Sequence, residues 1–170
     1  MTVIRDERAT DEDAIRALND AAFGQPGEGL LVDALRACCD EIVSLVAERN
    51  GEIAGHIFFS PVILKREDEP NWVGMGLGPM SVLPADQNQG IGSQLVQDGL
   101  DRMKAAGWPF VVVLGHPEFY PRFGFERASK YRVRCPWEVP DEVFMIAVFD
   151  ATRQIGGGTA YYRDEFGAVI

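Results

Sequence analysis

The chain has 170 residues, of which 46% are hydrophobic, and a formal net charge of −10. This length and composition indicate one globular domain with a substantial core. A general nucleic-acid binder needs clustered lysines and arginines, so the acidic balance argues against that class. It mildly suits a cationic small partner, but surplus acidic residues are more often a solubility feature.

The N-terminal part of the chain predicts a strand followed by two helices. Residues 3–8 have the character of a short strand, and Thr10 followed by Asp13 indicates a helix start with acidic residues in the first turn. Apolar residues then recur at helical spacing as far as Phe23. After the breaker FGQPGEG the same spacing resumes over residues 30–38, which predicts a second helix.

The middle of the chain predicts a hairpin, another strand and a long helix. Asn50-Gly51 lies between two strand-like runs within residues 42–64, the pattern of a two-residue hairpin turn. Residues 65–70, KREDEP, form a solvated turn, and residues 72–84 predict the next strand. Residues 90–106 carry their apolar side chains on one side, which indicates an amphipathic helix.

Strands dominate the remainder of the chain. The β-branched run in residues 108–115 predicts a buried central strand, and residues 117–125, PEFYPRFGF, predict a short helical turn that opens onto another strand. Residues 144–149 are the clearest of the later strands. The order of elements indicates an α/β or α+β domain, a mixed sheet with helices on its faces. We expect a single domain over residues 1–170, with a core at about 3–149 and a C-terminal extension at 150–170.

The three cysteines, Cys38, Cys39 and Cys135, form neither a CxxC pair nor a set of zinc ligands, so no metal site is expected. The sequence shows no signal peptide and no apolar run near 18 residues. We therefore expect a cytoplasmic protein with reduced thiols and no membrane partner.

A glycine-containing turn lies between the strand at 72–84 and the helix at 90–106. Its backbone N–H groups lie at a helix N-terminus, where they lack intrahelical partners and where the helix dipole adds positive charge. Gly90 and Gly92 allow a ligand to approach the backbone closely, an arrangement suited to a pyrophosphate. A plain helix entry is the alternative interpretation. The chain has no P-loop motif, and GMGLGP has Pro79 where the third glycine of a dinucleotide fingerprint belongs.

The motif QNQGIG resembles Q/R-x-x-G-x-G/A, the pyrophosphate-binding signature of the GNAT N-acetyltransferase superfamily. Around it, GPMSVLPADQNQGIGSQLV resembles that family's fourth strand, turn and third helix, and VVVLGHPEFYPRFGFERA resembles the end of its acetyl-CoA site. The stretch GHIFFSPV is similar to one branch of small bacterial predicted acetyltransferases. The resemblance covers about residues 3–149. It implies a mixed, mostly antiparallel sheet flanked by helices, with splayed fourth and fifth strands, and acetyl-CoA as the acetyl donor.

The resemblance also implies roles for individual residues. The backbone of Met80, Ser81 and Val82 would bond the acetyl carbonyl and the pantetheine, with the Val82 N–H polarising the thioester. The pyrophosphate would be held, chiefly by backbone groups, by Gln87, Asn88, Gln89, Gly90, Ile91, Gly92 and Ser93. Asn88 stands where many relatives have a basic residue, and Val113 stands where many have an asparagine.

Tyr120 is the expected general acid for the departing thiolate, because a phenol with a pKa near 10 keeps its proton at neutral pH. A core aromatic is the alternative, since three phenylalanines surround it in the sequence. The general base stays open among four candidates: Glu28, His56, His116 and Glu118. Glu28 lies in the loop GQPGEG, where the family often builds its acceptor wall, so it is either a base or an acceptor contact. We expect His56 to pack.

These features predict an acetyl-CoA-dependent N-acetyltransferase that acts on a primary amine by direct attack in a ternary complex. The acceptor would be a small molecule or a peptide, and homodimers are common in the superfamily. The alternatives are a non-catalytic module that binds CoA or acyl-CoA and a nucleotide-binding regulator that uses the same turn.

Overall fold

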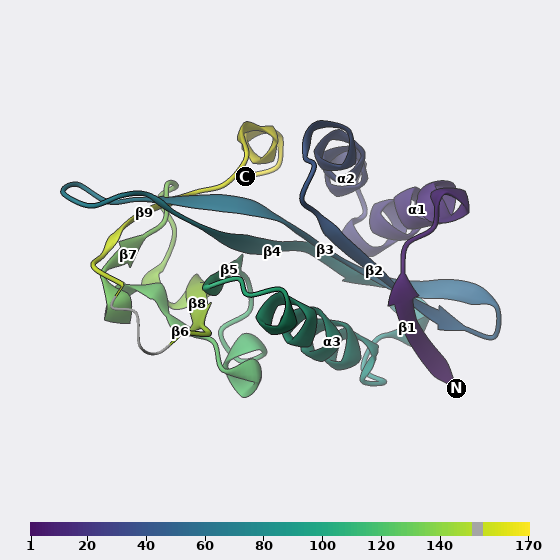
Figure 1. Ribbon diagram of the computed structural model, residues 1–170. Coiled ribbons are helices and arrows are strands. Elements are labelled where there is room, and N and C mark those ends of the chain that lie inside the picture. Colours follow the sequence, from purple (N-terminus) through teal and green to yellow (C-terminus); the bar gives the residue numbers. More distant parts are fainter. Residues whose placement is uncertain (151–154) are drawn as a thin grey trace.

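The computed structural model describes residues 1–150 and 155–170, and the strands among these residues form one sheet (Figure 1). Across the main path of the sheet the order is β1 (Thr2–Asp6), β2 (Val43–Arg49), β3 (Glu52–Lys65), β4 (Trp72–Val82), β5 (Phe110–Leu114), β8 (Phe144–Val148) and β6 (Glu126–Arg127). Neighbours on this path are antiparallel except β4 and β5, which are parallel. The predicted mixed, mostly antiparallel sheet is confirmed.

Two further strands lie off this path. β9 (Gly158–Tyr161) pairs with the end of β3, beyond the stretch of β3 that β2 covers, and also with β7 (Val133–Arg134). Of the extension expected at 150–170, residues 151–154 lie outside the described part. The residues after them return to the sheet through β9, and Tyr162 and Phe166 are buried in its core.

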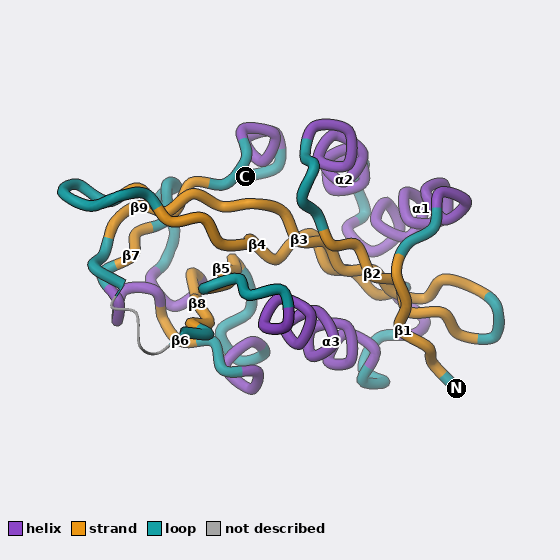
Figure 2. The backbone as a smooth tube through the Cα atoms, viewed as in Figure 1, coloured by secondary structure: helices purple, strands orange, loops and turns teal. Residues whose placement is uncertain are grey.

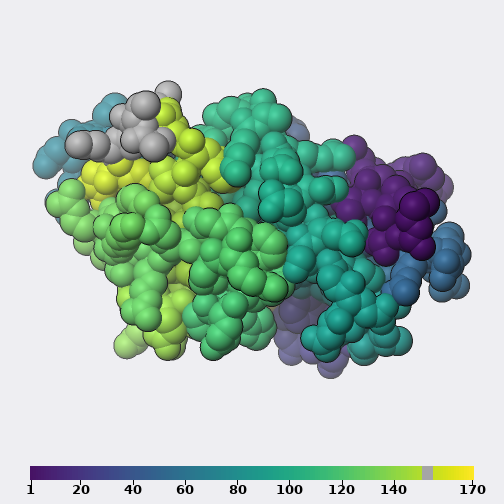
Figure 3. Space-filling model, turned by 90° about the horizontal axis from the view of Figure 1, so that it is seen from below, coloured from purple at the N-terminus to yellow at the C-terminus, as the bar shows by residue number. Residues whose placement is uncertain are grey.

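Helices cover both faces of the sheet (Figures 1 and 2). α1 (Glu12–Phe23), α2 (Gly27–Cys38) and a short 3₁₀ helix, Asp164–Ala168, lie on one face. α3 (Ile91–Ala105) lies on the other. Seen from the α3 face, this helix lies between the N-terminal strand and the segment that follows β5 (Figure 3). The expected α/β arrangement is therefore confirmed.

The strands divide their side chains between two hydrophobic clusters, one on each face. On β2, Val46 belongs to the cluster under α1 and α2, whereas Leu45 and Ala47 belong to the cluster under α3. This follows from the two-residue period of a strand. Because both faces are covered, β3 is buried without interruption from Ala54 to Ser60.

The Asn50-Gly51 hairpin is confirmed, since both residues adopt positive φ angles, 54° and 81°, as a turn of this type requires. The predicted start of the first helix at Thr10 is wrong. A 3₁₀ turn, Ala9–Asp11, comes first, and the Asp11 carboxylate accepts the backbone N–H of Arg8 at 2.7 Å, so α1 begins at Glu12.

The second helix also begins earlier than the sequence predicts. Gly24, at φ 68°, ends α1, and α2 starts directly after Pro26. Glu28 therefore lies in the first turn of α2 and not in a loop, as expected from the sequence. This position favours a carboxylate, because it lies near the positive end of the helix dipole.

Candidate active site

The parallel strands β4 and β5 separate close to the centre of the sheet. Their pairing runs from Met75–Val111 to Leu77–Val113, after which β5 ends at Leu114 while β4 continues to Val82. The splay expected for the fourth and fifth strands is therefore present. Among the described residues, no strand pairs with the last five residues of β4 on the β5 side.

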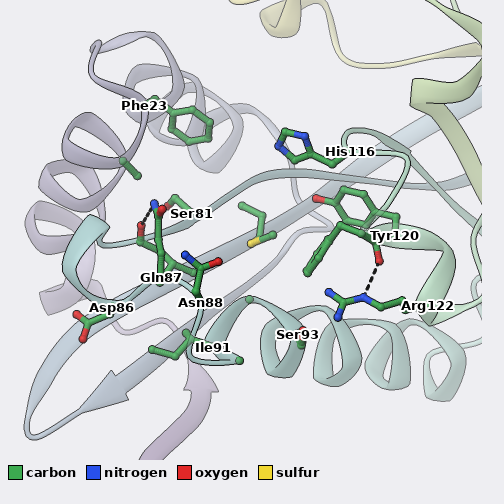
Figure 4. Close-up of a pocket in the computed structure, with 16 residues that line it drawn as sticks. Phe23, Ser81, Asp86, Gln87, Asn88, Ile91, Ser93, His116, Tyr120 and Arg122 are labelled. Atoms are coloured by element: carbon green, nitrogen blue, oxygen red, sulfur yellow. Dashed lines mark hydrogen bonds between the residues drawn. The ribbon is translucent and has the colours of Figure 1, made fainter.

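A cavity of about 590 Å³, here called the first cavity, lies at this opening (Figure 4). The structure brings nine of the ten predicted cofactor residues to its wall: Met80, Ser81, Val82, Gln87, Asn88, Gly90, Ile91, Gly92 and Ser93. The exception is Gln89, whose side chain contacts Arg49 and donates a hydrogen bond to the carbonyl of Ala85 at 3.3 Å. The remaining lining residues are Asp86, in the turn between β4 and α3, and residues from the end of α1 and from the segment after β5.

The turn before α3 presents unpaired backbone donors to the first cavity. Gly90 caps the helix in the left-handed region, at φ 86°, and its carbonyl accepts the first intrahelical bond, from Gln94. The N–H groups of Ile91, Gly92 and Ser93 thus have no partner within the helix. The side-chain amide of Gln87 donates to the carbonyl of Val82 at 3.2 Å, which ties the turn to β4. This geometry is suited to an anion.

Tyr120 is at once a core aromatic and part of the cavity wall. It opens a 3₁₀ helix, Tyr120–Phe123, and its ring packs edge-on against Phe119 and Phe125. Gly115 makes room for the ring, since a Cβ there would lie 2.3 Å from a ring carbon. Burial raises the pKa of Tyr120 to about 12. The described residues offer its hydroxyl no hydrogen-bond partner, and the hydroxyl points into the opening beside His116 (Figure 4).

Arg122 is a cavity residue that the sequence analysis missed. Its Nε donates to the carbonyl of Phe119 at 3.2 Å, its guanidinium lies 4.7 Å from the Phe119 ring, and it points toward Ser93 at the start of α3 (Figure 4). It is the one lysine or arginine among the described residues that line the first cavity. The arginine in the motif PRFGF is the sequence signal from which this role could have been predicted. The lining carboxylate, Asp86, is paired with Arg49 at 3.4 Å.

A series of buried polar side chains, joined by hydrogen bonds, links this cavity to the opposite side of β3. The Ser81 hydroxyl donates to Asn19 Oδ1 at 3.1 Å, and Asn19 Nδ2 donates to the carbonyl of Ile15 at 3.0 Å. The same Nδ2 lies 3.4 Å from Nδ1 of His56. Ser81, Asn19 and His56 are all buried. Because the amide can only donate from Nδ2, Nδ1 of His56 is the acceptor.

The series of hydrogen-bonded side chains continues from His56 toward solvent. Its Nε2 lies 2.9 Å from Ser44 Oγ, Ser44 contacts the Glu7 carboxylate, and Arg36 Nε donates to Glu7 at 2.6 Å. Burial, with a smaller contribution from the positive charge of Arg36, lowers the pKa of His56 to about 3. His56 therefore packs as a neutral imidazole, as expected, and does not line the first cavity.

The other base candidates differ in position. His116 lines the first cavity and also a second one on the α1–α2 face, whereas Glu28 lines only the second. Glu118 is exposed and lines neither.

Two of the three cysteines have thiols that are harder to deprotonate than usual. All three are free, and burial raises the pKa values of Cys39, to about 11, and of Cys135. Within residues 1–150 and 155–170 no group of three or more histidine, cysteine or acidic residues is placed to hold a metal ion. No helix in the described part is long and apolar enough to cross a membrane.

Fold and cavity together define an α/β protein in which a turn suited to an anion lies beside an open strand edge. The GNAT acetyltransferase domain family matches residues 3–128. The chain is 36% identical over 164 residues to the uncharacterized N-acetyltransferase YhbS of Escherichia coli K12, covering 95% of this chain and 96% of that protein. The chain therefore belongs to the GNAT acetyltransferase family, which confirms the resemblance seen in QNQGIG.

Two solved structures are similar over nearly the whole chain. The crystal structure of Escherichia coli YhbS in complex with CoA gives a TM-score of 0.86 at 34% identity and covers 98% of this chain and 92% of that one. A GNAT family acetyltransferase from Brucella melitensis in complex with acetyl-CoA gives a TM-score of 0.78 at 36% identity and covers 98% of each chain.

Proposed function

We propose that this protein transfers the acetyl group of acetyl-CoA to a primary amine by direct attack in a ternary complex. One observation carries the proposal: the first cavity combines an open β4 edge, the N-terminus of α3 and the Tyr120 hydroxyl. The complexes of the two structural relatives with CoA and acetyl-CoA support acetyl-CoA as the donor.

The open edge of β4 would bind the thioester and the pantetheine arm. The N–H of Leu83 donates to the carbonyl of Ala54 at 2.8 Å and so points toward β3. Because successive N–H groups of a strand point to opposite edges, those of Val82 and Met80 point toward the side that β5 has left. An N–H there would polarise the acetyl carbonyl, whose oxygen gains negative charge when the amine attacks.

The start of α3 and Arg122 would hold the phosphates. The N–H groups of Ile91, Gly92 and Ser93 supply donors at the positive end of the helix dipole. Arg122 supplies a full positive charge from a different segment, which offsets the loss of a basic side chain at Asn88.

Transfer forms the N–C bond of the amide and breaks the C–S bond of the thioester. The attacking nitrogen loses a proton, and the departing thiolate gains one. His116 is the base candidate that the geometry favours, because it lines both cavities where they meet.

Tyr120 would donate a hydrogen bond to the departing sulfur. Its pKa of about 12 means that the hydroxyl is protonated at neutral pH. Complete transfer from such a phenol to a thiolate of pKa about 8.5 is uphill by roughly 5 kcal/mol. The hydrogen bond that Tyr120 donates to sulfur while the C–S bond breaks therefore carries most of the stabilisation. The thiolate takes the proton of Tyr120 as it leaves, and the phenolate then regains a proton from solvent.

The test combines binding with turnover. CoA release is followed with a thiol reagent against a panel of amines, and acetyl-CoA, ATP and NAD binding are compared by calorimetry. We expect acetyl-CoA to bind tightly, ATP and NAD not to do so, and CoA to be released only when an amine is present. In Tyr120→Phe we expect a kcat about 100-fold lower and an unchanged acetyl-CoA Kd. Acetyl-CoA binding without release by any amine would leave a CoA-binding module, and equal turnover in Tyr120→Phe would remove the role of the hydroxyl.

A further inference from the structure

A second cavity, of about 330 Å³, opens on the α1–α2 face of the sheet. It shares Phe23, Met80, His116 and Tyr120 with the first cavity, so the two meet where β4 and β5 separate. The glycine turn and Arg122 line only the first cavity. With acetyl-CoA in the first cavity, as proposed above, the second is the space that remains for the acceptor.

The wall of the second cavity is largely hydrocarbon. Leu31 comes from α2, Leu77 from β4 and Leu114 from β5, and Phe166 and Val169 come from the C-terminal segment. Leu31, Leu77 and Phe166 are no more than 5% exposed, so this surface belongs to the packed core and is preformed. An apolar wall binds alkyl or aryl groups at roughly 25 cal/mol per Å² buried and penalises any charge that it desolvates.

The polar groups of the second cavity are few and specific. Glu28 is the one acidic side chain among the described lining residues, which include no lysine or arginine. Its carboxylate accepts hydrogen bonds from Gln25 at 2.8 and 3.2 Å but has no described cationic partner. The Tyr162 hydroxyl is buried without a hydrogen-bond partner among the described residues. The cavity thus offers the negative charge of Glu28 and the hydroxyl of Tyr120, which it shares with the first cavity.

We propose that the acceptor is a primary monoamine on an alkyl or aryl body, without a carboxylate and without a second ammonium group. Glu28 attracts the cationic amine, the apolar wall holds the body, and the nitrogen reaches the thioester beside His116. An amino acid would bring a carboxylate that no lysine or arginine of the described lining neutralises, and a polyamine would bury a further ammonium against hydrocarbon. The inference rests on the proposed acetyl transfer.

The experiment measures binding of chosen amines to the CoA-loaded protein by calorimetry, a readout that needs no turnover. The probes are 2-phenylethylamine, phenylalanine, which adds a carboxylate to the same body, and spermidine, which adds ammonium groups. We expect 2-phenylethylamine to bind at least tenfold more tightly than either.

Two variants with the same change of charge test the role of Glu28. Glu28→Gln should weaken 2-phenylethylamine about fivefold and leave CoA binding unchanged. Glu52→Gln, at the exposed start of β3 and outside both cavities, should change neither. Phe23→Ala removes an aromatic wall that is 40% exposed, so the fold is retained, and it should weaken the same amine about tenfold.

The outcomes separate this inference from the proposed function. If spermidine or phenylalanine binds and is acetylated better than 2-phenylethylamine, the acceptor class is wrong and acetyl transfer stands. If 2-phenylethylamine binds as expected but releases no CoA from acetyl-CoA, the acceptor class stands and acetyl transfer fails. If no amine binds or reacts, both fail.

Discussion

The neutral, buried His56 should make the protein lose stability in mild acid. Its ring is fully buried, with its pKa lowered from 6.5 to about 3 by burial and by the charge of Arg36. Below pH 6.5 the unfolded chain binds a proton at His56 that the folded protein does not bind. The free energy of unfolding therefore falls as the pH drops from about 6.5 toward 3. Above pH 6.5 His56 is neutral in both states, so the protein keeps its full stability with respect to this group.

The size of this effect follows from the two pKa values. Each pH unit within that window costs about 1.4 kcal/mol, so lowering the pH from 7.5 to 4.5 should remove about 3 kcal/mol through His56 alone. This is a large share of the stability of a typical domain. Asp11 and Glu126 also have lowered pKa values, through hydrogen bonds from Arg5 and Lys130 respectively, and add to the loss in acid.

The variant His56→Gln isolates the histidine. Its amide can still donate to Ser44, so we expect a uniform loss of about 1–3 kcal/mol at pH 7.5 from the imperfect contacts. Urea unfolding at pH 7.5 and 4.5 gives the free energy of unfolding of each protein. The fall between the two pH values should be about 3 kcal/mol smaller in the variant, because the carboxylates are common to both. An equal fall in both proteins would refute the reasoning.

Substitutions at three positions test the first cavity. Arg122→Ala should weaken CoA binding about tenfold, as measured by calorimetry, and Arg122→Lys should nearly restore the affinity. High salt should reduce the difference in CoA affinity between the unchanged protein and Arg122→Ala. A loss of affinity that does not depend on salt would contradict an ionic role. Gly115→Ala, which forces a Cβ to within 2.3 Å of the Tyr120 ring, should lower kcat more than it changes the acetyl-CoA Kd, and normal kcat would show that the ring can yield. Gly90→Ala strains a residue at φ 86° in otherwise open space and should cost about 1–2 kcal/mol, divided between unfolding and CoA affinity; unchanged values in both would contradict this.

The parts of the fold that the sequence predicts well are encoded by neighbouring residues. Asn50 and Gly51 are two residues whose own φ preferences make the hairpin, and the apolar period of α3 needs only one segment. The predicted start of the first helix was wrong because it relied on such a local pattern alone. A Thr-x-x-Asp spacing is a local signal, but Arg5 on the neighbouring strand binds the Asp11 carboxylate at 2.7 Å and helps to hold the chain in a 3₁₀ turn before α1.

The two halves of the proposed site differ in how far apart their residues are in the chain. The first cavity draws most of its wall from two short segments, residues 80–93 and 116–122, so two motifs were enough to locate it. The second cavity needs Glu28 from α2, Leu77 from β4 and Tyr162 from the segment after β9. No single stretch of sequence joins these residues, since only the sheet brings them together.

Gly76 shows how closely that assembly depends on the sheet. A Cβ at this position on β4 would lie 2.9 Å from a ring carbon of Tyr162, so the glycine leaves the space in which the C-terminal aromatic packs. Tyr162 in turn contacts Phe166, and both line the second cavity. A substitution at Gly76 should therefore move the wall of the second cavity while the glycine turn at the start of α3 stays in place. Amine affinity would change without a matching change in CoA affinity, which a single calorimetric series on Gly76→Ala can measure. Equal losses for both would mean that the two cavities cannot be altered separately.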